Sequence, residues 1–311
     1  MQIPSHSTHQ IQDSTKLQCF MECPRKYFYA YVLGWQREEP NLHLVFGEAW
    51  HLAMETLLRY GYSNDAVELA YLSLEKKYRE HFSPIHDESN FPKVPGFAFE
   101  MLQNYVRKHA DDHANYEVLY TEIAGSVSVG SRSIYFKTDS ILYGLAGPLR
   151  GKYFSLEHKT SSRRDPDPAR AWSLKTQIGT YTHVLYCLYP AAEVYGIRIN
   201  MGIFQKTRPD FLRIDLPRTP AQMETWLWTV NQWLDQIDRE FDRLASCTAA
   251  DSLLFAFPMN SEACASWSGC EWHDFCSAWS NPLQHCDQVP FGYVVRYWDP
   301  REIEATTKME I

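Results

Sequence analysis

The spacing of hydrophobic and polar positions changes along the chain. In the first third, apolar residues recur every three to four positions, which is typical of helices with one buried face. The clearest case is 46–60, where Leu52, Ala53, Leu57 and Leu58 fall at helical spacing. We therefore expect a helical N-terminal region. Further helices are predicted at 14–21, 65–81 and 97–113.

From residue 116 the pattern changes to the two-residue alternation of strands. Three strands are predicted at 116–129, 133–143 and 153–160, separated by glycine-containing turns. The remaining elements are a helix at 169–188, strands at 194–205 and 211–216, a helix from 219 to about 246, and a loop-rich tail from 257. This order predicts an α/β protein with a helical N-terminal extension.

Composition narrows the class of protein. The chain has 311 residues, 45% hydrophobic and 22% charged, so we expect one large or two small globular domains. It has neither a long apolar run nor a basic segment leading into an apolar one, so we expect no membrane span, no secretory signal and a cytoplasmic location. A reducing compartment argues against disulfides among the eight cysteines. The net charge of −8 excludes a uniformly basic protein but allows a local basic groove.

The third predicted strand ends with a charged pair. Glu157 and Lys159 are two residues apart and share a strand face, whereas His158 points away. Asp139, on the preceding strand, is disfavoured among apolar residues unless it is paired or binds a ligand. Neighbouring strands would bring Asp139 and Glu157 to one Mg²⁺ or Mn²⁺ ion. The alternatives are an ordinary surface ion pair and a solvated carboxylate.

Two predicted helices carry polar pairs four residues apart, which places each pair on one helix face. His51 and Glu55 form the first pair, and either His51 supplies a third metal ligand or the two make a simple intrahelical contact. Gln177 and Tyr181 form the second. They present an amide and a phenol to nucleic acid, or they are a surface glutamine over a partly buried tyrosine.

Cysteines and basic residues cluster separately. Four late cysteines follow two early ones, and thiolates at short spacing suit an iron–sulfur cluster, or zinc with the nearby histidines.

The segment 150–175 contains seven basic and three acidic residues. This excess of positive charge suits contacts with nucleic-acid phosphates, unless the segment is an ordinary solvated loop. Lys206, Arg208 and Arg213 are expected to extend this patch. The stretch 147–152 lacks P-loop spacing, so the chain is not expected to be a helicase motor.

The order of these motifs resembles the RecB-like branch of the PD-(D/E)XK nuclease superfamily. The likeness rests on a helix with His51, a strand with Asp139, a strand with Glu157-x-Lys159 and a helix with Gln177-x-x-x-Tyr181. The segments 23–27, CPRKY, and 46–51, FGEAWH, resemble the opening of that branch. One early and three late cysteines resemble its iron–sulfur subset, which includes AddB-type nuclease domains, CRISPR adaptation nucleases and phage exonucleases. The likeness spans 23–276.

The resemblance implies a role for each matching residue. It makes His51, Asp139 and Glu157 ligands of Mg²⁺ or Mn²⁺, and Lys159 the catalytic lysine. It makes Gln177 and Tyr181 the element associated with DNA binding. The ligands of a 4Fe-4S cluster would be Cys23, Cys264, Cys270 and Cys276. The family spacing is C-x2-C-x5-C, whereas five residues separate Cys264 from Cys270. Cys286 therefore stays an alternative to Cys264, and zinc or free thiols stay alternatives to the cluster.

The implied protein is a metal-dependent deoxyribonuclease with a restriction-endonuclease-like core. We expect a helical region at 1–115, the nuclease core at 116–218, and a long helix with a cysteine-rich tail at 219–311. The resemblance favours an exonuclease on single-stranded DNA or DNA ends, in recombination, repair or phage DNA processing, alone or with a helicase or recombination partner. The candidate DNA contacts are Arg163, Arg164, Arg170 and Lys175. The competing class, a non-catalytic DNA-binding or assembly subunit with a structural iron–sulfur or zinc site, is disfavoured because Asp139, Glu157 and Lys159 are all present.

Overall fold

The computed structural model describes residues 3, 5–265 and 269–311. The chain forms two compact units, each assembled from three segments of the sequence. The first unit contains Met1–Glu39, Ser126–Phe136 and Ala221–Ile303, and the second contains Pro40–Gly125, Lys137–Pro220 and Glu304–Ile311. The expected metal-binding residues belong to the second unit, and the four expected cluster cysteines belong to the first.

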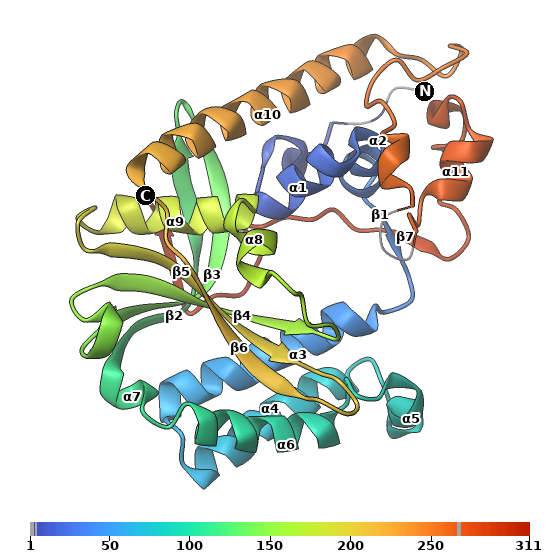
Figure 1. The fold of residues 1–311 in the computed structure, drawn as a ribbon. Helices are drawn as coiled ribbons and strands as arrows, with labels where there is room; N and C mark the ends of the chain where they lie inside the picture. Colours follow the sequence, from blue (N-terminus) through green and yellow to red (C-terminus); the bar gives the residue numbers. More distant parts are fainter. Residues whose placement is uncertain (1–2, 4, 266–268) are drawn as a thin grey trace. The chain divides into compact units, whose positions relative to one another are not determined.

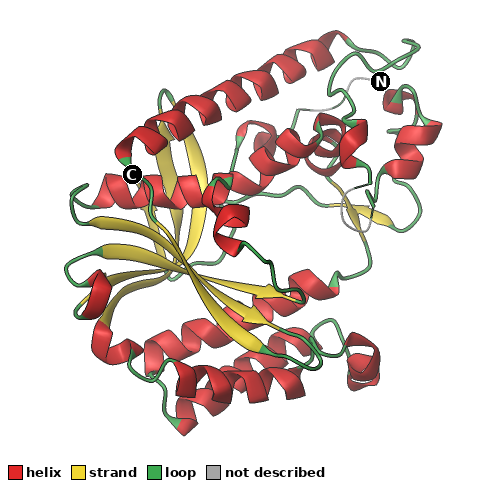
Figure 2. Ribbon diagram, in the orientation of Figure 1, coloured by secondary structure: helices red, strands yellow, loops and turns green. Residues whose placement is uncertain are grey.

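A six-stranded sheet in the order β6-β5-β4-β3-β2-β8 is the main β element (Figure 1). β4 and β5 pair in parallel, whereas β3 with β4 and β5 with β6 pair antiparallel. Helices flank this mixed sheet, so the predicted α/β class is confirmed (Figure 2). The strands are β2 (Tyr116–Val129), β3 (Arg132–Gly144), β4 (Tyr153–Ser161), β5 (Val194–Ile203), β6 (Asp210–Leu216) and β8 (Thr307–Glu310).

In the second unit, a helical layer packs beneath the sheet in the view of Figure 1. Its central helix α3 (Leu42–Tyr60) is capped by Asn41, whose side chain accepts a hydrogen bond from the His43 amide, and it ends at Gly61 with φ +88°. α3, α4 (Asn64–Arg79) and α6 (Pro95–Lys108) share an apolar core with Phe204 and Phe211 of the sheet side. The short elements of this layer are η3 (Pro84–His86), α5 (Asp87–Asn90) and α7 (Asp112–Asn115).

The single helix predicted at 169–188 is wrong, because the chain forms α8 (Pro168–Ser173) and α9 (Thr176–Leu188) instead. At the break, the Arg218 guanidinium donates hydrogen bonds to the carbonyl of Ser173 at 2.6 Å and to that of Lys175 at 3.1 Å. The backbone of Lys175 is not helical, with ψ 140°. A tertiary contact therefore satisfies carbonyls that a continuous helix would have bonded internally.

The first unit joins the start of the chain to its later part. It holds α1 (Ser14–Glu22), which is capped by the Asp13 carboxylate, and most of α10 (Pro220–Ser246). The indole of Trp298 donates to Asp13 at 2.7 Å, and Phe257 stacks on Tyr27 at 6.0 Å between ring centroids. The other elements include η1 (Ser7–Gln10), α2 (Pro24–Tyr27), the π-helix η2 (Phe28–Val32), β1 (Trp35–Arg37), η5 (Ser261–Ala263), α11 (His273–Ala278), η6 (Pro282–Gln284) and β7 (Tyr293–Val295).

The strand β8 was not predicted from the sequence. It occupies the end of the sheet beside β2. The two backbones approach so closely that a Cβ atom on Gly125 would lie 1.7 Å from the carbonyl oxygen of Met309. Only glycine fits at this position, so residue 125 is adapted to the presence of β8.

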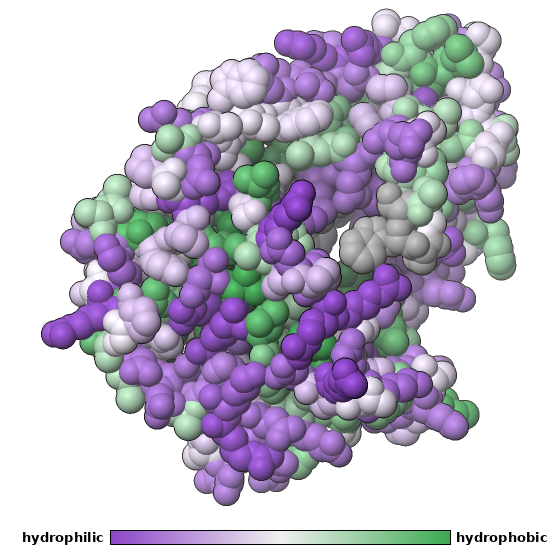
Figure 3. Space-filling model, in the orientation of Figure 1, coloured by the Kyte–Doolittle hydropathy of each residue, from purple (hydrophilic) through white to green (hydrophobic). Residues whose placement is uncertain are grey.

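Surface polarity agrees with this arrangement. The outward side of α6 is mostly hydrophilic in Figure 3, as its exposed residues Glu100, Gln103, Asn104 and Arg107 require. Among the described residues, no helix combines the length and apolar character that crossing a bilayer needs.

Candidate metal centre and nucleic-acid interface

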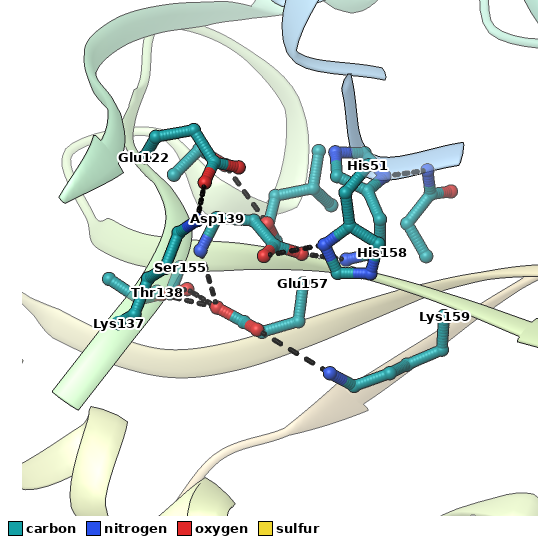
Figure 4. Close-up of polar contacts among 12 residues, drawn as sticks. His51, Glu122, Lys137, Thr138, Asp139, Ser155, Glu157, His158 and Lys159 are labelled. Atoms are coloured by element: carbon teal, nitrogen blue, oxygen red, sulfur yellow. Dashed lines mark hydrogen bonds and ion pairs between the residues drawn. The ribbon is translucent and has the colours of Figure 1, made fainter. Parts of the chain in front are cut away.

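Three side chains from different elements converge in the second unit. His51 comes from α3, Glu122 from β2 and Asp139 from β3, and each offers a ligand atom within 4.8 Å of the other two. The Nδ1 atom of His51 lies 2.9 Å from Oδ1 of Asp139 (Figure 4). Imidazole and carboxylate are ligands that suit Mn²⁺, and carboxylates suit Mg²⁺. The expected approach of His51 to Asp139 is therefore present.

Glu122 was not predicted as a site residue. It lies in β2 with φ +48°, a left-handed conformation that is uncommon for a residue with a side chain. The amide of Thr306 donates to its carbonyl at 2.8 Å, and Lys137 Nζ lies 2.5 Å from its carboxylate. A carboxylate inside an apolar strand was the signal that identified Asp139, and the same signal applies to Glu122.

Glu157 lies beside this group, with its two oxygens in different environments. Oε1 accepts hydrogen bonds from the Thr138 hydroxyl, from the Ser155 hydroxyl at 2.8 Å and from the Asp139 amide at 3.2 Å (Figure 4). Oε2 is buried and has no hydrogen-bond partner among the described residues. Lys159 Nζ lies 3.9 Å from Oε2, so Glu157 and Lys159 are adjacent, as their spacing predicts. One carboxylate oxygen is thus held by protein donors, whereas the other lies near the Lys159 ammonium group.

The electrostatics of the group follow from its burial. Burial acts against ionisation of Asp139, but His51 and Lys159 outweigh it and hold the pKa of Asp139 well below its ordinary value. Burial alone would lower the pKa of His51, yet the Asp139 carboxylate raises it overall. Burial, followed by the Asp139 charge, raises the pKa of Glu157 to about 7 and also raises that of Glu122. Two carboxyl groups with raised pKa values beside an ionised one indicate a site suited to a cation.

His158 contacts Asp139 through its backbone. Its backbone amide donates to Oδ2 of Asp139 at 2.6 Å, and its ring nitrogen Nδ1 lies 3.0 Å from the Asn200 amide nitrogen. Burial lowers the pKa of His158 to about 3, so the ring is neutral. His158 therefore fixes the orientation of Asp139.

The second helix pair lies on α9, which packs against β4 and β5. The Gln177 amide donates to the Tyr181 hydroxyl at 2.8 Å, so the two side chains contact each other. Glu55, the other member of the first helix pair, is engaged elsewhere, since its Oε1 accepts from Thr121 at 3.3 Å and from Thr306 at 3.2 Å. His51 is consequently the residue that α3 directs to the carboxylates.

Comparison with known proteins identifies the family. A model of the PD-(D/E)XK nuclease superfamily matches residues 14–277, most of the chain. The chain belongs to the PD-(D/E)XK nuclease superfamily. Eleven chains of solved structures match it, and one of them is titled "Crystal structure of SSO0001". That match has 15% sequence identity over 56% of this chain and 74% of the other, with a TM-score of 0.25. No curated protein matches.

The expected DNA contacts of this PD-(D/E)XK chain lie on the surface of the second unit. Arg163, Arg170 and Lys175 are exposed, whereas Arg164 pairs with Asp210 at 2.5 Å. The expectation that Arg213 extends the patch is wrong, because its guanidinium is half-buried in a two-pronged ion pair with Asp112. Fewer basic side chains are therefore available to bind phosphate than a count of basic residues in the sequence indicates.

The four cysteines that were expected to bind a cluster in this PD-(D/E)XK chain lie in the first unit. Cys23 Sγ accepts from the Asn260 amide at 3.3 Å, and the Cys270 amide donates to the Cys264 carbonyl at 3.0 Å. Burial raises the pKa of Cys276 to about 11, with Cys23 and Cys270 adding to the shift. Burial also raises the pKa of Cys270, and Cys264 and Cys23 contribute.

Cys286 has different surroundings. Its thiol donates to the Pro282 carbonyl at 3.0 Å, and burial, followed by the charge of Asp287, raises the pKa of Cys286 to about 12.

Proposed function

We propose that the chain is a Mg²⁺- or Mn²⁺-dependent deoxyribonuclease of the RecB-like branch, acting as an exonuclease on single-stranded DNA or DNA ends. The observation that carries the proposal is the convergence of His51, Glu122 and Asp139 beside Glu157 and Lys159. Membership of a nuclease superfamily supports the same chemistry. Recombination, repair or phage DNA processing, with a helicase or recombination partner, is the proposed setting.

The residues fit a divalent ion. His51, Glu122, Asp139 and the free oxygen of Glu157 are the proposed ligands. When bound, such an ion lowers the pKa of a water molecule and neutralises the scissile phosphate. The chain's own residues orient these groups, since Thr138 and Ser155 hold one oxygen of Glu157 and the His158 amide holds one oxygen of Asp139.

Lys159 has a separate role in this proposal. Its ammonium group is near Oε2 of Glu157 at 3.9 Å, too far for a tight ion pair. A cation in this position can hold the attacking hydroxide and stabilise the negative charge that develops on the phosphate. No side chain needs to form a covalent bond to DNA.

Digestion of end-labelled single- and double-stranded DNA with Mg²⁺ and with Mn²⁺ tests the proposal. The wild-type protein should degrade at least one of these substrates, and Lys159→Ala, prepared alongside, should bind DNA but not cut it. Products that shorten from one end identify an exonuclease, and internal products identify an endonuclease. Wild-type protein that binds DNA but never cuts it would favour the alternative, a non-catalytic DNA-binding or assembly subunit.

We also propose that Cys23, Cys264, Cys270 and Cys276 hold a 4Fe-4S cluster. The Cys23 and Cys264 thiols both contact the backbone of Asn260, and all four cysteines belong to the first unit, which supports this ligand set despite the irregular spacing of Cys264 and Cys270. Four thiolates are the ligand set that such a cluster requires. Anaerobic purification followed by iron and zinc analysis and a visible spectrum tests the proposal. Brown protein with about four iron atoms per chain supports it, whereas colourless protein with zinc refutes it.

A further inference from the structure

A buried lysine without a carboxylate partner lies in the second unit, away from the metal centre. Lys93, in the loop before α6, is only 4% exposed. Its ammonium group donates to Nδ1 of His43 at 3.1 Å, and this is its only hydrogen-bond partner among the described residues. The Phe46 ring centroid lies 5.9 Å from Nζ. Because an ammonium group has three donors, two of them are free for an anion.

His43 makes the same position more attractive to an anion. Since its Nδ1 accepts from Lys93, the neutral ring carries its proton on Nε2 and can donate it outward. His43 is exposed and lies in the first turn of α3, where the helix dipole favours negative charge. Burial lowers the pKa of Lys93, and a bound anion would oppose that effect.

A glycine in α3 supplies an independent observation. Gly47 lies in the interior of the helix, where glycine costs about 1 kcal/mol relative to alanine. A Cβ atom at this position would meet nothing within 4 Å, so packing within the protein does not require glycine. A glycine that the protein itself does not need is typical of a place where a ligand approaches the backbone closely.

His43, Gly47 and His51 are spaced four residues apart, so they form one ridge along α3. Each of the three is at least partly accessible to solvent. Glu48, the next residue, lies 3.6 Å from Lys77, which it shares with Glu80 at 3.0 Å, so its negative charge beside the ridge is only partly offset. The ridge thus connects the metal centre at His51 to the cationic pair at His43, with a bare backbone between them.

We propose that a nucleic-acid strand runs along this ridge over Gly47, and that Lys93 and His43 bind one of its backbone phosphates. The inference rests on the proposed nuclease function and adds a second phosphate site to it. Eight residues of helix span about 12 Å. At about 3.4 Å per nucleotide, this corresponds to three or four nucleotides of stacked strand, or fewer of an extended one. Phe91, two residues before Lys93, is 38% exposed with Lys206 Nζ 5.8 Å from its ring centroid, and an exposed aromatic ring of this kind can stack on a base.

The test is a set of single-stranded oligonucleotides, each with one uncharged methylphosphonate linkage at a successive position. Binding is measured by fluorescence anisotropy with EDTA present, and the cut site is mapped separately with Mg²⁺ or Mn²⁺. For wild-type protein we expect one position, up to four linkages from the cut, at which the neutral linkage weakens binding roughly tenfold. In Lys93→Met, this binding penalty, the loss of affinity caused by the neutral linkage at that position, should vanish, whereas the penalties at other positions should remain.

Three further variants keep the result interpretable. His43→Ala changes an exposed side chain and should reduce the same penalty, even if Lys93→Met does not fold. Lys76→Met removes an exposed lysine of α4 and should leave the penalty unchanged. Gly47→Ala should melt no lower than wild type but bind several-fold more weakly, and Gly47→Leu should bind more weakly still.

The outcomes separate the two proposals. A penalty that persists in both Lys93→Met and His43→Ala overturns the phosphate site, and unchanged binding by Gly47→Leu overturns the path over α3. Wild-type protein that shows the penalty but cuts no strand refutes the nuclease proposal while the phosphate site stands. Wild-type protein that binds no strand refutes both.

Discussion

Replacing Glu157 by glutamine and by alanine should separate its structural role from its chemical role. Both changes remove the charge that we assign to metal binding, so both variants should lose metal-dependent cleavage. Only alanine removes Oε1, which accepts hydrogen bonds from Thr138, Ser155 and the Asp139 amide. At about 1 kcal/mol each, these bonds amount to about 3 kcal/mol.

Glutamine keeps these bonds if its carbonyl oxygen takes the place of Oε1, and its NH₂ group then replaces the oxygen left for the cation. Because burial and Asp139 raise the pKa of Glu157, glutamine also relieves an unfavourable charge, and Glu157→Gln should melt no lower than wild type at pH 8. The alanine variant should melt roughly 5–10 °C below the glutamine variant.

The assays are thermal melting at pH 8 without divalent ions, calorimetric titration with Mn²⁺, and cleavage of labelled DNA. Glu157→Gln should bind DNA with nearly wild-type affinity, because phosphate contacts elsewhere dominate binding. Equal melting temperatures for the two variants would refute the hydrogen-bonded cradle around Oε1. Wild-type cleavage by Glu157→Gln would refute the assignment of Glu157 as a ligand.

Three other predictions concern the rest of the molecule. Cys276→Ala should lose the brown colour and melt at a lower temperature, because metal–thiolate sites couple metal binding to folding. Lys159→Ala should keep the colour and the melting temperature and lose only turnover. Anaerobic visible spectra and melting curves compare the two variants, and a Cys276→Ala protein that stays brown would exclude Cys276 as a ligand. Replacing Arg163, Arg164 and Arg170 by alanine should weaken the salt dependence of DNA binding. The slope of log K against log salt concentration should fall by about 2 rather than 3, because Arg164 is paired with Asp210. An unchanged slope would mean that these residues do not touch phosphate. Burial lowers the pKa of Lys16 from 10.5 to about 8. Between pH 8 and 10.5 the unfolded state therefore binds more protons than the folded state, and the free energy of unfolding should rise across that range by up to about 3 kcal/mol. Urea unfolding at each pH measures this rise, which should be absent in Lys16→Met.

Much of the fold could be predicted because local patterns determine it. The strand 116–129 was predicted with the bounds that β2 has, since its alternation and the following glycine turn are local signals. The break between α8 and α9 could not be predicted, because it depends on Arg218, more than forty residues later in the chain. The strand β8 was missed because its short segment forms a strand only by pairing at the sheet edge.

Some residues of the candidate site could likewise be found from the sequence, and others could not. His51, Asp139, Glu157 and Lys159 follow motif spacing and could be found from the sequence. Glu122 could not be placed beside them, because its approach depends on a left-handed backbone conformation and on a hydrogen bond from Thr306. The engagement of Arg213 by Asp112 also depends on residues distant in sequence, so a count of basic residues overestimates the charge available to DNA.

The interleaving of the two units has a consequence for how the protein is synthesised and how it can be shortened. The second unit is complete only when 304–311 has been made, which is after every segment of the first unit. The centre that includes Glu122 therefore gains its Thr306 contact late in translation, after its other residues have left the ribosome. A fragment ending near residue 220, which would look like a minimal nuclease core, would leave the edge of β2 without its β8 partner, and unpaired edges promote aggregation.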